Sequence, residues 1–279
     1  MKLIKFLAIA FLVPSIFIFT SCLDSQIPEA SDEALLTEIE EQINTPTVAD
    51  AALDNAEAAV KAFTTQKSAN ANGVQKMVAF YPIVTKLSEG DKFPKVYEIN
   101  YGDNYYDAKN NLYRGIITYT EYSYKASKYD YTEFYINQDR IEGYKQGDVN
   151  QKGVLNLSSD ITTTNLETKQ STNRYTERVR TTTDNNKTET DYTDDSYEFT
   201  GYSKGTALVK GEVYDYNFGI EKPLQTVTNY KYFVSGNTYL RIGKNEQSMD
   251  YGNGEVDNLA VRTINGKERN VVLNWGEKR

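Results

Sequence analysis

The 279-residue sequence contains no histidine, and its only cysteine is Cys22. Without histidine, a Ser-His-Asp triad, a histidine-based zinc-protease motif and an imidazole general base are excluded. No glycine-rich phosphate loop opens a helix, so nucleotide chemistry has no support. A single cysteine forms no internal disulfide, so stability has to come from a packed core. We therefore expect no catalytic residues, no enzymatic activity, no metal and no cofactor.

Basic residues are fewer than acidic ones, 31 against 39, which gives a formal net charge of −8. Nucleic acid and anionic lipid surfaces repel such a chain, so neither is an expected partner. Residues 23–41 contain no lysine or arginine at all. This composition is typical of a solvated tether.

The first 22 residues, MKLIKFLAIAFLVPSIFIFTSC, have the organisation of an export signal. Two lysines precede an uncharged, mostly apolar run at residues 6–20, which is short for a membrane span. The run ends at Cys22 and resembles the lipobox of bacterial lipoproteins, although Phe19 stands where leucine is usual. The resemblance implies cleavage of a signal peptide, residues 1–21, and a lipid anchor on Cys22. An ordinary secretory signal or membrane anchor with an incidental cysteine is the alternative.

Two short helices are expected after Cys22. The first begins near Ser31 and has an apolar stripe at helical spacing, and the second covers residues 51–63 with a stripe of its own. The stripes are Leu35, Leu36, Ile39 and Ile43, then Ala52, Ala56, Val60 and Phe63. Residues 22–91 are therefore predicted to form an acidic tether with short helices.

Residues 92–279 are predicted to form an antiparallel β domain, because tyrosine, threonine, valine and isoleucine dominate and turn residues recur regularly. Asn265-Gly266 between two alternating runs predicts a tight hairpin. Strands are expected over residues 196–203 and 205–218, with a turn at Ser235–Asn237. The predicted fold class is mainly β, an antiparallel meander curled into a sandwich or open barrel, preceded by a short helical segment.

The pattern Tyr-Gly-[Asp/Asn]-[Asn/Gly]-x-x-Asp occurs at residues 101–107 and again at 251–257. One interpretation is a pair of calcium loops, because calcium takes carboxylate and amide oxygens. The candidate ligands are Asp103, Asp107, Asn253 and Asp257. The spacing is not that of an EF-hand, and glycine, aspartate and asparagine in such a loop also suit a tight turn. The turn is the preferred interpretation.

The 23 tyrosines allow two interpretations. Cross-strand aromatic pairs would stabilise the sheet. A solvent-facing platform would instead stack on sugars or on a partner protein. The candidate ligand-binding residues are Tyr122, Tyr124, Tyr129 and Tyr131. Glu133, Asp194, Asp195 and Glu198 are carboxylates of the kind glycosidases use, and are expected to be solvated surface groups.

Residues 93–120, FPKVYEINYGDNYYDAKNNLYRGIITYT, and the closing SMDYGNGEVDNLAVRTINGKERNVVL resemble a family of β-rich lipoproteins of the Bacteroidota. The resemblance implies a lipid-anchored envelope protein of the outer membrane and assigns no catalytic residue. The expected role is non-enzymatic binding or structure, with a protein or glycan partner and the membrane reached through the lipid. A glycan-binding or carbohydrate-active surface protein is the alternative.

Overall fold

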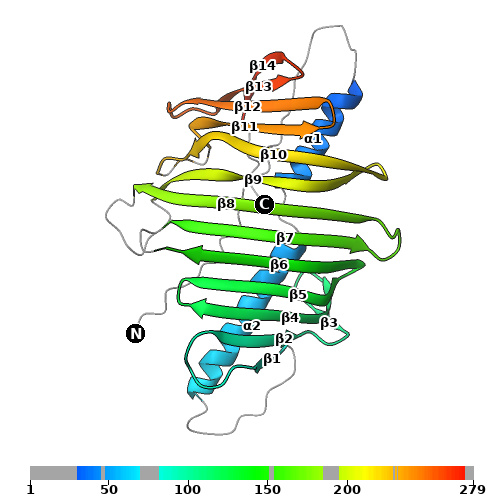
Figure 1. Ribbon diagram of the computed structural model, residues 1–279, viewed down its shortest axis with the longest axis vertical. Helices are drawn as coiled ribbons and strands as arrows, with labels where there is room; N and C mark the ends of the chain where they lie inside the picture. The colour runs from blue at the N-terminus through cyan, green and yellow to red at the C-terminus, as the bar shows by residue number, and fades with distance from the viewer. Residues whose placement is uncertain are drawn as a thin grey trace. The chain divides into compact units, whose positions relative to one another are not determined.

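The computed structural model describes residues 30–44, 48–69, 82–150, 154–184, 195–228, 230 and 232–273. Two helices, α1 (Ala30–Asn44) and α2 (Val48–Ala69), precede the strands in these residues (Figure 1). The strands are β1 (Ile83–Lys86), β2 (Lys95–Asn100), β3 (Tyr105–Tyr106), β4 (Leu112–Ser123), β5 (Ala126–Ile136), β6 (Asp139–Val149), β7 (Leu155–Asn165), β8 (Ser171–Asp184), β9 (Ser196–Val209), β10 (Glu212–Gln225), β11 (Ser235–Ile242), β12 (Asn245–Asn253), β13 (Leu259–Ile264) and β14 (Lys267–Val272). The prediction of a mainly β chain with a short helical segment before it is confirmed.

The chain divides into two compact units, and each contains one helix and one run of strands. Among the described residues, unit 1 comprises residues 46–148 and 159–173, and unit 2 comprises residues 30–45, 149–158 and 174–273. Helix α2 belongs to unit 1. Helix α1 comes first in the chain and yet belongs to unit 2, with the C-terminal strands.

In unit 1, strands β1, β2, β4, β5 and β6 pair in that order, and β3 pairs with β4. Helix α2 buries Ala52, Ala56 and Ala59 against one face of these strands. Small side chains at this spacing let the helix backbone approach the sheet closely. The core beneath the helix consists of Ile99, Tyr101, Tyr113, Ile117, Tyr129, Tyr131, Phe134, Ile136, Ile141 and Ile161.

In unit 2, strands β8 to β14 pair in chain order. Helix α1 buries Leu36, Ile39 and Ile43, the stripe that the sequence predicts, against Ala207, Val209, Tyr216, Phe218, Leu240 and Ile242. Full burial of a leucine or isoleucine side chain is worth about 1.5–3 kcal/mol, so this stripe is enough to hold the helix in place.

All these pairings are antiparallel, which confirms the predicted meander. The strands belong to one 14-stranded sheet, in which β1 and β14 each have one partner among the described strands, so the sheet is open at both edges and is not closed into a barrel. A helix covers the apolar face of the strands in each unit. The predicted fold class, a mainly β antiparallel meander preceded by a short helical segment, is confirmed.

The hairpin at Asn265-Gly266 is confirmed, with φ of +47° and +81°. The expected break between strands near residue 204 is wrong. Strand β9 runs on to Val209, and the turn lies at Lys210-Gly211, where φ is +51° and +86°. Gly211 was the sequence signal for this turn, but the alternating residues on both sides of it made residues 205–218 look like one strand.

The turn expected at Ser235–Asn237 is also wrong, because these residues lie in β11. A Cβ atom on Gly236 would lie 2.2 Å from the carbonyl oxygen of Pro223 on β10. The glycine marks a close approach of two strands and a register shift rather than a chain reversal. Strand β1 begins at Ile83, ahead of the boundary expected at residue 92.

Candidate functional site

The repeated Tyr-Gly pattern has the same side-chain-to-backbone hydrogen bond in both units. The N–H of Gly102 donates to Asn100 Oδ1 at 2.8 Å, and the N–H of Gly252 donates to Asp250 Oδ1 at 2.9 Å. Each preceding tyrosine, Tyr101 or Tyr251, is buried in the core of its own unit. The pattern therefore encodes a buried ring followed by a side-chain-capped turn.

In the first loop, hydrogen bonds within the loop occupy the carboxylate of Asp107. It accepts the backbone N–H groups of Lys109 and Asn111, the Asn111 amide and the Tyr113 hydroxyl, at 2.8–2.9 Å. Partial burial would raise the pKa of Asp107, but these hydrogen bonds outweigh burial and lower that pKa. Asp103 is exposed beside the same turn.

In the second loop, Asn253 Oδ1 accepts the N–H of Glu255 at 3.3 Å, and Asp257 Oδ1 accepts the N–H of Leu259 at 3.0 Å. These are again contacts within the loop. Among the described residues, no three acidic or cysteine side chains are grouped as metal ligands. Both loops thus use their oxygens to hold backbone turns, the function that glycine, aspartate and asparagine commonly have there.

The structure separates the four tyrosines proposed as a ligand platform. Tyr129 and Tyr131 are 7% and 3% exposed and lie in the core beneath α2. Tyr122 and Tyr124 are about half exposed at the end of the β4–β5 hairpin. Alternation along the paired strands places Tyr122 on the face opposite to Tyr129 and Tyr131. Of these four tyrosines, Tyr122 and Tyr124 are accessible to a ligand.

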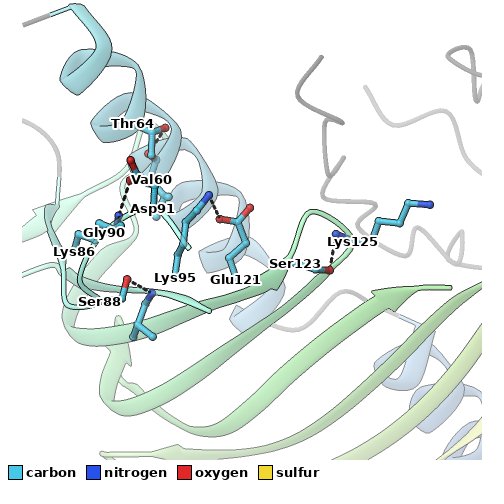
Figure 2. A network of polar contacts seen from close by, with 11 residues as sticks. Val60, Thr64, Lys86, Ser88, Gly90, Asp91, Lys95, Glu121, Ser123 and Lys125 are labelled. Carbon is cyan, nitrogen blue, oxygen red and sulfur yellow. Dashed lines mark hydrogen bonds and ion pairs between the residues drawn. The ribbon is translucent and has the colours of Figure 1, made fainter. Parts of the chain in front are cut away.

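Tyr124 belongs to a cluster that we call the aromatic corner, defined by Phe93, Lys95, Glu121 and Tyr124. The rings of Phe93 and Tyr124 meet edge to face, with centroids 4.7 Å apart. Lys95 Nζ lies 4.4 Å from the Phe93 centroid and 5.6 Å from that of Tyr124. The same ammonium pairs with Glu121 at 3.4 Å (Figure 2). The corner joins an exposed aromatic ring to a fixed cation and a carboxylate.

The loop before β2 supports this corner. Ser88 Oγ accepts the N–H of Val96 at 3.1 Å, and Lys86 binds Asp91 at 3.0 Å and the carbonyl of Gly90 (Figure 2). The N–H of Lys125 donates to Ser123 Oγ at 3.1 Å, while the ammonium of Lys125 extends away from the other labelled groups (Figure 2). These contacts fix the backbone on both sides of Phe93 and Tyr124.

The face of each sheet that points away from its helix carries tyrosines with basic neighbours. In unit 1, Lys128 lies over Tyr144 and Arg114 over Tyr135, at 5.0 and 5.3 Å from the ring centroids. In unit 2, Lys204 lies over Tyr175 at 5.4 Å. Cation–π contacts at exposed sites contribute about 0.5–1 kcal/mol each. They hold the rings in fixed positions on faces that the helices leave uncovered.

Unit 2 also contains a shallow polar groove of about 540 Å³. It is lined by Asp32, Lys244, Asn245, Glu246, Ser248, Thr263, Asn265 and Gly266. No aromatic ring lines it, so it lacks the stacking surface that sugars commonly use. The aromatic corner in unit 1 has such a surface.

Buried charge lies between α1 and the strands of unit 2, and no sequence pattern indicated its position. Arg262 is 1% exposed and Glu40 is 6% exposed. Arg262 donates to Gln247 Oε1 and, at 2.9 Å, to Thr37 Oγ1, and Gln247 donates to Glu40 at 2.6 Å. The guanidinium and the Glu40 carboxylate are 3.6 Å apart. We call these four residues the buried network.

Burial raises the pKa of Glu40, and Arg262 only partly opposes that rise. Burial likewise lowers the pKa of Arg262. Both shifts have the direction expected when charged groups are taken out of water. The network fixes α1 on the sheet and is too enclosed to meet a substrate.

The carboxylates considered for glycosidase chemistry do not form a pair in the described residues. Glu133 is exposed at a bulge with φ of +48°, and Glu198 is half-exposed beside Gln225. Asp195 was expected at the surface and is instead buried, with Oδ2 accepting the Tyr197 hydroxyl at 3.0 Å. Asp194 lies outside the described residues.

Cys22 and the apolar run before it also lie outside the described residues. Neither described helix is long and apolar enough to cross a membrane. No family model, curated protein or solved structure matches the chain. The class of protein is therefore argued from the residues themselves.

Proposed function

We propose that this protein is a lipid-anchored protein of the bacterial outer membrane with a non-enzymatic binding or structural role. Cys22 carries the lipid, and the acidic residues after it connect the lipid to α1. The lipobox-like end of the signal supports the anchor. Two acyl chains are enough for stable membrane attachment.

The observation that carries the binding role is the face of the strands in each unit that neither described helix covers. Each helix covers one face, and the other presents rings fixed by cations, such as Tyr144 under Lys128. Rigid, amphipathic tyrosines give contact area at low entropic cost. Such rings suit contact with a protein or glycan partner.

Glycan binding is the second candidate, and the aromatic corner favours it. An exposed aromatic ring supplies a stacking surface for a sugar, and nearby Lys95 and Glu121 supply polar contacts. Tyr124 is 53% exposed, so the ring is available to a ligand without rearrangement of the core.

Protease treatment of intact cells tests the location. If the protein faces outward, we expect protease to remove units 1 and 2 from whole cells. We expect the Cys22→Ser variant to be lost from the membrane fraction. Protection until the outer membrane is opened would restrict the role to the periplasmic side. Retention of Cys22→Ser in the membrane after full signal cleavage would refute the lipid anchor.

A glycan array tests the second candidate. The probe is the full chain, compared with Tyr124→Ala and with the control Tyr106→Ala, whose ring is equally exposed at 54% in the same unit. Loss of a specific signal at least tenfold in Tyr124→Ala alone supports the aromatic corner. Equal signals from all three proteins, or none, contradict it.

A further inference from the structure

Arg178 on β8 of unit 2 is a charged side chain that no described group neutralises. It forms no hydrogen bond or ion pair with any described residue, and its Nη1 is enclosed without a partner. Its guanidinium lies 5.1 Å from the ring centroid of Phe218, which belongs to the core under α1. A cation held against a core without a counterion is costly, and the cost needs an explanation.

A glycine stands opposite Arg178 in the neighbouring strand. Arg178 is paired with Gly201 on β9, where φ is +129° and the strands approach too closely for a Cβ atom. The residue directly across from Arg178 therefore has no side chain to cover it. Only glycine fits at this position, because φ is positive and a Cβ atom would lie 2.2 Å from the carbonyl oxygen of Glu177.

Three hydroxyl groups adjoin Arg178 on the same face. Thr176 Oγ1 and Ser203 Oγ are 3.1 Å apart, and Ser203 Oγ and the Tyr216 hydroxyl are 3.2 Å apart. Three hydroxyls have three protons and these two contacts use two, so one proton remains to be donated. Thr176, which is half-exposed, forms the accessible end of this row.

A second arginine adds positive charge along the same strand face. Arg174 donates to the carbonyls of Gln42 and Ile43 at the C-terminal end of α1. Burial, opposed by Tyr216 and reinforced by Arg174, lowers the pKa of Arg178 to about 10. Arg178 therefore keeps its charge at neutral pH in the absence of a neutralising group.

We propose that Arg178 is the centre of an anion-binding site that takes a carboxylate or phosphate group of a ligand. The planar guanidinium donates two parallel hydrogen bonds to such a group, and the remaining hydroxyl proton of the Thr176–Ser203–Tyr216 row gives a third. Phe218 contacts the apolar side of the guanidinium. This site lies in unit 2 and is independent of the lipid anchor and of the aromatic corner.

Thermal unfolding of the full chain in detergent, followed by circular dichroism, tests the proposal. Inorganic phosphate and acetate are titrated separately at constant ionic strength set with sodium chloride. Ligand at 100 times its Kd raises the folded-to-unfolded ratio about 100-fold, so Tm rises with concentration of the anion that binds. A rise with phosphate alone or with acetate alone identifies the ligand group.

Arg178→Met is expected to abolish the rise, and Arg241→Met is the matched control. Arg241 lies in the same unit over the ring of Tyr239, at 4.7 Å, but is exposed and paired with Glu246. If Arg178→Met does not fold, Arg178→Lys replaces it. This variant keeps the positive charge but loses the two parallel N–H donors of the guanidinium, so we expect the affinity for the anion to fall at least tenfold. No anion-specific rise in the wild type, or an unchanged rise in the Arg178 variant that folds, overturns the proposal.

Discussion

Replacing Arg262 with methionine should destabilise unit 2 strongly. The substitution keeps an apolar stem of similar length but removes the guanidinium, which leaves the buried Glu40 carboxylate without a cation. It also removes the donors to Gln247 and Thr37. Breaking a buried pair in this way costs about 3–5 kcal/mol, a large part of the total stability of a typical domain.

Urea unfolding monitored by far-UV circular dichroism measures this cost. Arg269→Met is the control, because Arg269 pairs with Glu33 of the same helix but remains 30% exposed, and exposed pairs contribute about 0–1 kcal/mol. The double variant Glu40→Leu with Arg262→Met should recover most of the loss, since no charge is left buried. A cost for Arg262→Met no larger than that of Arg269→Met would refute the reasoning.

Three further predictions concern stability. Gly115→Ala should lower the free energy of unfolding in urea by about 2 kcal/mol or more beyond the loss caused by Gly211→Ala. The two φ angles are nearly the same, +88° and +86°, but a Cβ atom at Gly115 would lie 1.9 Å from a backbone oxygen, whereas one at Gly211 would meet nothing within 4 Å. Equal losses would show that backbone strain alone matters. Tyr113→Phe should lower the free energy of unfolding by about 1–2 kcal/mol, because it loses two hydrogen bonds. Tyr101→Phe should be neutral or stabilising, because the buried hydroxyl of Tyr101 has no partner among the described groups. A larger loss for Tyr101→Phe than for Tyr113→Phe would contradict this. Burial raises the pKa of Glu40, so the folded chain keeps a proton that the unfolded chain has released. The wild type should therefore lose stability relative to Glu40→Gln as pH rises from 4 to 7, measured by urea unfolding at both values. A stability difference between the two proteins that does not change with pH would exclude the shift.

Local patterns predicted the local structure. The stripe of Leu36, Ile39 and Ile43 identified α1, and Asn265-Gly266 identified a hairpin. Both depend on helical period or turn chemistry within a few residues. The turn interpretation of the Tyr-Gly pattern rests on the same local chemistry, and the hydrogen bonds of both loops follow it.

Contacts between distant residues could not be predicted. Gln247 is 207 positions from Glu40, and nothing in either neighbourhood indicates that they meet. The proposed tyrosine platform was divided because α2 covers the face of the strands that carries Tyr129 and Tyr131. The unneutralised Arg178 depends on strand register with Gly201, which one sequence does not reveal.

The membership of α1 in unit 2 has a consequence for the proposed lipid anchor. With the lipid proposed at Cys22, seven residues, 23–29, lead to the start of α1. Even fully extended, they reach at most about 25 Å. On the proposed anchor, the C-terminal strands of unit 2 would be tethered to the bilayer through the N-terminal helix that packs on them.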